Sequence, residues 1–180
     1  HYFSSNIAWH NRHDRTFEEM SAAWGFNAVE VSQGIACADL DNDGALDIVI
    51  NCLNAKPLIY RNRTDAPRLA VRLKGRKPNT QGNGALVSVT GGAVASQAQE
   101  ILSGGRYLSG DDPMRVFAAG SLTNQLSIEV RWRSGALSRV SNAVLGPICS
   151  DNAPNSTSGR EPLSSFPFTV IRKNSIDINA

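Results

Sequence analysis

Apolar and polar side chains alternate along much of this chain, which predicts β-strands. In the run 68–73, Leu69, Val71 and Leu73 fall on one face and Arg72 on the other. Similar short runs recur, each bounded by Gly, Asn, Asp, Ser or Pro. The predicted strands are 35–38, 46–52, 58–61, 68–73, 85–89, 95–101, 114–117, 126–132, 137–140 and 168–172. Short strands without a long helix favour an all-β sandwich, a barrel or propeller blades.

Two segments depart from this pattern. Residues 16–24 have helical propensity, with Glu18 and Glu19 near their start, and we expect one or two helical turns there. Residues 149–165 are rich in Ser, Asn, Pro and Gly, which is typical of a flexible linker. The apolar run 166–171 that follows is β-prone, and we interpret it as a closing strand.

Composition and charge divide the chain into two parts. Hydrophobic residues make up 41%, enough for a core, and no apolar run approaches the roughly 20 residues that span a bilayer. We therefore expect a soluble protein. Residues 1–60 carry three Lys/Arg and eight Asp/Glu, whereas residues 61–180 carry fifteen and eight. This shift from net negative to net positive indicates two units that meet near residue 61.

An acidic loop between two predicted strands carries the clearest chemistry. Asp39, Asp41, Asp43 and Asp47 offer carboxylates and Ala45 a backbone carbonyl, at alternate positions of a tight loop. The glycine between Asp43 and Ala45 permits the sharp turn. Calcium prefers six to eight oxygen ligands, and a bound cation offsets the repulsion between the carboxylates. We therefore predict a calcium site formed by these five residues; the alternative is an acidic surface hairpin without metal.

The acidic loop differs from the helix-loop-helix calcium site. That site has twelve residues and ends in Glu, whereas this loop has nine and ends in Asp47, between strands rather than helices. Magnesium is disfavoured because it demands tighter octahedral geometry and retains its waters. Since an ion enclosed by carboxylates leaves little room for substrate, we expect a structural role for the calcium.

The residues around this loop resemble a known repeat. The sequence from Phe17 to Asn62 resembles a blade of the FG-GAP/VCBS calcium-binding β-propeller repeat. The likeness is carried by Phe17-Glu18-Glu19-Met20, Trp24-Gly25-Phe26, Gly34-Ile35-Ala36, the acidic loop and Ile59-Tyr60-Arg61-Asn62. An apolar strand end followed by Asn-Arg occurs at residue 11 and again, 51 residues later, at residue 62, a separation comparable to one propeller blade.

The following part resembles an ASPIC/UnbV domain, as found in the cartilage acidic protein-like family. The residues that carry this likeness are Leu69-Ala70-Val71-Arg72-Leu73-Lys74-Gly75, Asn79, Gly84-Ala85, Gly105-Arg106-Tyr107-Leu108-Ser109 and Val130-Arg131-Trp132-Arg133-Ser134-Gly135. The resemblances imply one or more C-terminal propeller blades in 1–65 and a β-sandwich or barrel-like ASPIC/UnbV domain in 66–148. A polar linker and closing strand would occupy 149–180.

These resemblances imply a calcium-stabilised extracellular module without enzymatic activity. It would either have a structural role or bind a protein or glycan, as in adhesion or a matrix. The sequence contains no Gly-x-Ser-x-Gly motif, and its three histidines lie in one segment. Two alternatives stay open: a biosynthetic enzyme of the UnbV type with cyclase-like activity, and a self-assembling surface or filament subunit.

Expectations about partners and location follow from the same reading. A single blade would expose apolar faces, so we expect further blades or subunits to cover them, with this chain the C-terminal part of a longer protein. The basic run 61–77 lacks interleaved aromatics, so we expect no nucleic acid, and an anionic polysaccharide is the alternative to a solvated strand face. The protein would be secreted, or periplasmic or at the cell surface in a bacterium. Asn62 and Asn155 begin sequons that could carry N-glycans.

The three cysteines, Cys37, Cys52 and Cys149, cannot all pair within one chain. If the acidic loop closes a hairpin, residues 37 and 49 lie roughly opposite each other. Cys52 then lies about 10 Å further along its strand, beyond the roughly 7 Å Cα limit of a disulfide. A Cys37–Cys52 disulfide is therefore not expected, and pairing of Cys149 is left open.

Overall fold

The computed structural model describes residues 2–145, 168–170 and 177–179. Within these ranges every regular element is a β-strand, so the predicted all-β class is confirmed. The same ranges contain no helix long and apolar enough to cross a membrane. Cys149, Asn155 and the predicted linker 149–165 lie outside the described residues.

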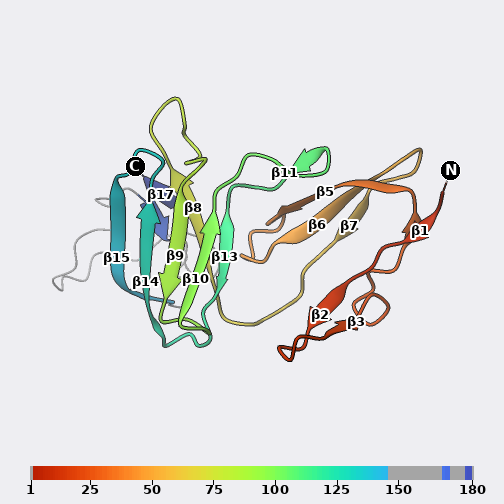
Figure 1. Cartoon of the computed structure of the whole chain (residues 1–180), viewed down its shortest axis with the longest axis horizontal. Coiled ribbons are helices and arrows are strands. Elements are labelled where there is room, and N and C mark those ends of the chain that lie inside the picture. Colours follow the sequence, from red (N-terminus) through yellow and green to blue (C-terminus); the bar gives the residue numbers. More distant parts are fainter. Residues whose placement is uncertain (1, 146–167, 171–176, 180) are drawn as a thin grey trace.

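The first part of the chain forms three small antiparallel sheets (Figure 1). Strand β1 (Ser4–Ser5) pairs with β4 (Val29–Glu30) in one of them. Strand β2 (Trp9–Asn11) pairs with β3 (Phe17–Glu19) in another. These short ribbons hold few buried side chains, so they contribute little to a core.

The predicted helical turn at 16–24 is wrong for most of its length. Residues Phe17–Glu19 are strand β3, because their backbone pairs with β2 instead of closing i to i+4 bonds. A turn follows, in which Trp24 N–H donates to the Met20 carbonyl at 2.9 Å. Pairing with a neighbouring strand therefore overrides the local helix propensity.

The third small sheet carries the acidic loop. It consists of the antiparallel strands β5 (Ser32–Ala38), β6 (Asp47–Cys52) and β7 (Leu58–Tyr60), in that order. Cys37 lies opposite Ile48 rather than residue 49, because the loop between the strands is one residue shorter than assumed. Cys37 and Cys52 are both free thiols, in agreement with the expectation that they do not pair.

The second part of the chain is a sandwich of two four-stranded sheets (Figure 1). One sheet has the order β10-β9-β14-β15, with β9 (Leu86–Thr90), β10 (Ser96–Glu100), β14 (Gln125–Arg131) and β15 (Leu137–Val144). The other has the order β13-β8-β16-β17, with β8 (Arg68–Lys74), β13 (Arg115–Ala118), β16 (Phe168–Val170) and β17 (Asp177–Asn179). Neither sheet closes into a barrel within the described strands.

The hydrophobic core lies between these two sheets. Alternate residues of β8, β9 and β14 point inward, as the period-two pattern predicts. The buried cluster comprises Leu69, Val71, Leu73, Ala85, Val87, Val89, Ile101, Phe117, Ala119, Leu126, Ile128, Val130, Val140 and Leu145. Strand β16 pairs with β8 through Phe168–Val170, which is the described part of the closing strand predicted at 166–171.

A two-stranded ribbon from the sandwich part reaches the first part. It consists of β11 (Gly105–Arg106) and β12 (Ser109–Gly110), and it lies beside β5 (Figure 1). Ser109 Oγ donates to the Ile35 carbonyl at 2.5 Å, and Asp112 N–H donates to the Cys37 carbonyl at 2.9 Å. The strand that leads into the acidic loop is therefore held from the sandwich side.

Candidate metal centre

The acidic loop owes its shape to backbone conformations that few residues adopt. It joins β5 to β6, and Asn42 and Gly44 have φ angles of 58° and 77°. Asparagine and glycine adopt this left-handed region at the lowest cost. The loop can therefore reverse direction within a few residues while its alternate aspartates turn to one side.

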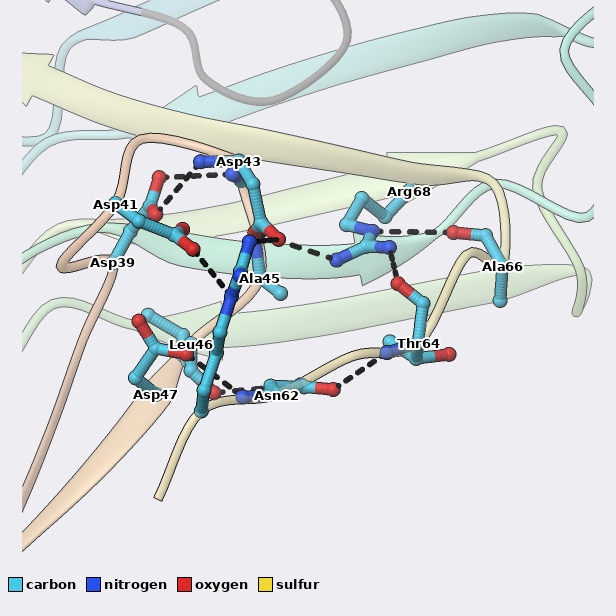
Figure 2. Close-up of polar contacts among 12 residues, drawn as sticks. Asp39, Asp41, Asp43, Ala45, Leu46, Asp47, Asn62, Thr64, Ala66 and Arg68 are labelled. Carbon is cyan, nitrogen blue, oxygen red and sulfur yellow. Dashed lines mark hydrogen bonds and ion pairs between the residues drawn. The ribbon is translucent and has the colours of Figure 1, made fainter. Parts of the chain in front are cut away.

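Backbone amides of the loop bind the carboxylates of the same loop (Figure 2). Asp39 Oδ1 accepts from Asp43 N–H at 3.0 Å, and Asp39 Oδ2 accepts from Gly44 N–H at 2.9 Å. Asp43 Oδ1 accepts from Ala45 N–H at 2.8 Å. These bonds fix where the carboxylates lie before any ligand arrives.

Three of the predicted ligands come together. Asp39, Asp41 and Asp43 each offer an oxygen, and these oxygens lie within 4.8 Å of one another. Burial raises the pKa of Asp39, and the charges of Asp43 and Asp41 add to that effect, while hydrogen bonds from Gly44 and Asp43 oppose it. The ionised loop is thus electrostatically unfavourable by itself, and a cation among the three carboxylates would relieve the repulsion.

Asp47 takes a different position from the other three aspartates. Its side chain is buried, with 2% exposed, and it lies outside the group of three. Its Oδ2 accepts from Leu40 N–H at 3.0 Å and its Oδ1 accepts from Asn62 N–H at 2.8 Å. Asp47 therefore joins the start of the loop to the end of β7. Each carboxylate oxygen can still accept a second partner, so these bonds leave it able to coordinate a metal.

Ala45 is also buried, and its amide belongs to the hydrogen-bond set of the loop. Coordination of a metal by the Ala45 carbonyl stays a prediction. The donors that the loop offers are all oxygens, without histidine or cysteine, which suits a hard cation such as calcium. The residues present therefore fit a calcium ion in the chemistry of their donors.

Two arginines that the sequence analysis did not connect with the site lie beside it. Arg61 Nε is 2.6 Å from Asp41 Oδ2, and its Nη2 is 4.0 Å from Asp43 Oδ2. Arg68 Nη1 is 3.9 Å from Asp43 Oδ1, is buried, and has no hydrogen-bond partner. The carboxylates thus already attract two guanidinium groups, so a metal ion would have to compete with them.

Asn62, which the sequence predicts as a glycan acceptor, also lies beside the acidic loop. Its side chain donates to the Leu46 carbonyl at 3.4 Å and accepts from Thr64 N–H at 3.1 Å (Figure 2). The predicted glycan acceptor is therefore part of the network that supports the acidic loop. The run Ile59-Tyr60-Arg61-Asn62, which carries the repeat resemblance together with the acidic loop, was the signal that could have connected Arg61 and Asn62 with the loop.

The contact with the sandwich ribbon reaches the residue just before the loop. Asp111 Oδ1 accepts from Cys37 N–H at 2.8 Å and from Arg106 Nε at 2.6 Å. Burial would raise the pKa of Asp111, but the bonds from Arg106 and Cys37 outweigh it and hold that pKa below its usual value. Burial raises the pKa of the Cys37 thiol. Strand β5, which leads into the acidic loop, is therefore joined to the second part of the chain by a charged contact.

Comparison with known proteins bears on the second part of the chain. The family model described as ASPIC and UnbV matches residues 75–147. No curated protein matches the chain. The FG-GAP/VCBS resemblance of the first part stays a prediction. Residues 75–147, which contain β9 to β15, are therefore similar to the ASPIC and UnbV family, as the sequence led us to expect.

Proposed function

We propose that this protein is a calcium-stabilised extracellular module with a binding or structural role and no enzymatic activity. Its first part would be an FG-GAP/VCBS blade, and its second part an ASPIC/UnbV domain beside it. The observation that carries the proposal is the group of three carboxylates, Asp39, Asp41 and Asp43, set close together by a loop with all-oxygen donors. Calcium would hold together a loop that otherwise concentrates like charges.

The surface of the first part supports a recognition role. Aromatic side chains are exposed there at Tyr2, Phe3, Trp9, Phe17 and Trp24. Large exposed apolar groups often mark sites of association. A protein or glycan partner, or further blades, would cover them.

Thermal unfolding with and without calcium tests the proposal. We expect calcium at about a hundred times its Kd to stabilise the loop by about 2.7 kcal/mol, which raises the melting temperature by several degrees. Isothermal titration should show one binding site per chain. Asp41→Asn should abolish both effects because it removes one of the three carboxylates.

Asp65→Asn is the matched control, because Asp65 is an exposed carboxylate in the segment after β7 and lies outside the group of three. It should leave the calcium response unchanged. A melting curve that does not move with calcium, together with no heat of binding, would refute the proposal. Equal loss in both variants would show only a general charge effect.

A further inference from the structure

A groove at one end of the sandwich, far along the chain from the acidic loop, has the features of a ligand site. It is about 580 Å³ in volume and lies between the β8–β9 loop and the β14–β15 hairpin, which Figure 1 shows at the same end of the sandwich. Its described lining residues are Gly75, Arg76, Asn79, Trp132, Arg133, Ser134, Ala136 and Ser138. Volumes of this size are usual for small-molecule sites.

Hydrogen bonds within each wall give the groove a fixed shape. In the β8–β9 loop, Gly75 N–H donates to the Thr80 carbonyl, and Asn79 exchanges side-chain bonds with Asn83 at 2.8 Å. In the hairpin, Trp132 N–H donates to the Ala136 carbonyl at 2.9 Å. Both walls are therefore closed turns that do not depend on a ligand.

The indole of Trp132 is held in place inside this groove. Its Nε1–H donates to Ser138 Oγ at 2.9 Å, and its ring edge packs beside Gly82. A Cβ at Gly82 would come within 2.9 Å of Leu73 and 3.2 Å of the ring, so a side chain there would require Leu73 to shift and would crowd the indole. The half-buried Trp132 thus offers a fixed apolar surface within reach of polar groups.

The charged residues that line the groove together with Trp132 are cations. Arg76 and Arg133 line the groove, and no Asp or Glu is among its described lining residues. An adjoining groove of about 390 Å³ shares Trp132 and Arg133 and adds Arg131, together with one acid, Glu100. Arg133 is exposed and forms no ion pair with a described residue. The site is therefore positively charged on balance and extends over more than one subsite.

We propose that this groove binds an acidic saccharide, with a sugar ring against Trp132 and its carboxylate or sulfate groups on Arg76 and Arg133. The ring of an acidic sugar has an apolar C–H face and anionic groups at its edge, which matches a groove lined by an indole and two guanidinium groups. Guanidinium groups bind such anions through paired hydrogen bonds. A nucleic acid fits less well, because it needs several aromatic platforms and Trp132 is the one aromatic among the described lining residues.

This inference narrows the recognition role proposed above to one class of ligand, but it does not depend on calcium. None of the loop aspartates lines either groove. Loss of calcium binding in Asp41→Asn and loss of saccharide binding are therefore separate results.

The test is a titration of the whole chain with a heparin-derived hexasaccharide, followed by calorimetry and by the Trp132 indole N–H resonance. We expect binding that shifts this resonance and that weakens at least tenfold in the double variant Arg76→Gln/Arg133→Gln. The matched control, Arg12→Gln/Lys56→Gln, removes the same charge from exposed positions of the first part and should bind within twofold of the unmodified chain.

Three further ligands separate the sources of the anionic chemistry. A neutral hexasaccharide should bind at least tenfold more weakly, and inorganic sulfate should not displace the acidic hexasaccharide at equal concentration. A single-stranded oligonucleotide of equal charge should also bind more weakly. Equal effects of the two double variants, an unmoved Trp132 resonance, or equal binding of sulfate or the oligonucleotide would each overturn the proposal.

Discussion

The two parts of this chain use apolar side chains in opposite ways. In the sandwich, inward residues of two sheets cover each other, and side chains such as Leu69, Phe117 and Ile128 are almost fully buried. Before residue 63, the buried apolar residues are Ala45, Ile50 and Cys52, while many aromatic side chains are exposed. Strands β5 and β6 are as long as the strands of the sandwich, so in that sheet the difference arises from whether a second sheet covers the first.

The comparison indicates what stabilises each part. The sandwich is stabilised mainly by burial of apolar area, which does not depend on ions. The first part depends more on polar contacts: the carboxylates of Asp39 and Asp47, and the contact of Asp111 with β5. Perturbations of the core, the acidic loop and the contact should therefore act on different parts of the molecule.

The largest expected effect is on the sandwich core. Phe117→Ala should lower the free energy of unfolding of the sandwich by about 3–5 kcal/mol, because it leaves a cavity where a ring is 1% exposed. Phe17→Ala, at a position 61% exposed, should cost less than about 1 kcal/mol. Urea unfolding measures both, with the indole resonance of Trp132 reporting on Phe117→Ala and that of Trp9 on Phe17→Ala. Equal losses would remove the basis of the comparison.

The next effect concerns Asp47. Asp47→Ala removes the acceptor of two backbone N–H groups, Leu40 and Asn62, and should cost about 2–4 kcal/mol in the first part. The resonances of Trp9 and Trp24 should report earlier unfolding, while that of Trp132 changes little. Asp47→Asn retains one oxygen acceptor and should cost less. Simultaneous loss of all three signals would show that the two parts unfold together.

A pH-dependent effect is expected at the contact between the parts. The pKa of Asp111 is lower in the folded chain than its ordinary value of 3.8. Its stabilising contribution is therefore complete above that value and is lost as the pH falls below it toward the lowered pKa. The protection of the Cys37 amide against hydrogen exchange, relative to its intrinsic rate at each pH, should fall over this range, and Asp111→Asn should lower it roughly tenfold at neutral pH. Exchange that is unaltered in the variant would contradict this role of Asp111.

The smallest effect is expected at Arg61. Its guanidinium pairs with Asp41 but is 60% exposed, so the pair contributes about 0–1 kcal/mol. Arg61→Gln should therefore tighten calcium binding by up to about fivefold, because a competitor for the carboxylate is removed. Arg63→Gln, its exposed neighbour in sequence, serves as the control, and calorimetry measures both. Weaker calcium binding in Arg61→Gln would show that Arg61 supports the site instead of competing for it.

The sequence predicted the strands that alternate or lie between turn residues. Strands β5, β6, β8, β9, β10, β13 and β14 begin and end within a few residues of the predicted runs. The ribbon β11–β12 and the strands β1 to β4 were missed, because two or three residues carry no readable period. Strand β3 was mistaken for helix, since local propensity contains no information about the pairing of Phe17–Glu19 with β2.

In the acidic loop, too, some features could be predicted from the sequence and others could not. Spacing alone was enough to bring Asp39, Asp41 and Asp43 together, because all three lie in one short loop whose backbone reverses at Gly44. The contacts of Arg61, Asn62 and Arg68 with the loop could not be derived from local spacing. Arg61 and Asn62 follow β7 and Arg68 begins β8, and the packing of these segments beside the loop is decided by the whole fold.

Local periodicity and turn chemistry in the sequence thus determined the all-β class, most of the longer strands and the three-carboxylate group. Only the tertiary structure decided that Asp47 faces backbone amides, that Asp111 joins the sandwich to β5, and that Arg76 lines one groove with Trp132 and Arg133. The physical reason is the separation in sequence between the residues that interact. Alternation and glycine turns act between residues that are near in sequence, whereas these contacts join segments up to 74 residues apart, which only chain packing brings together.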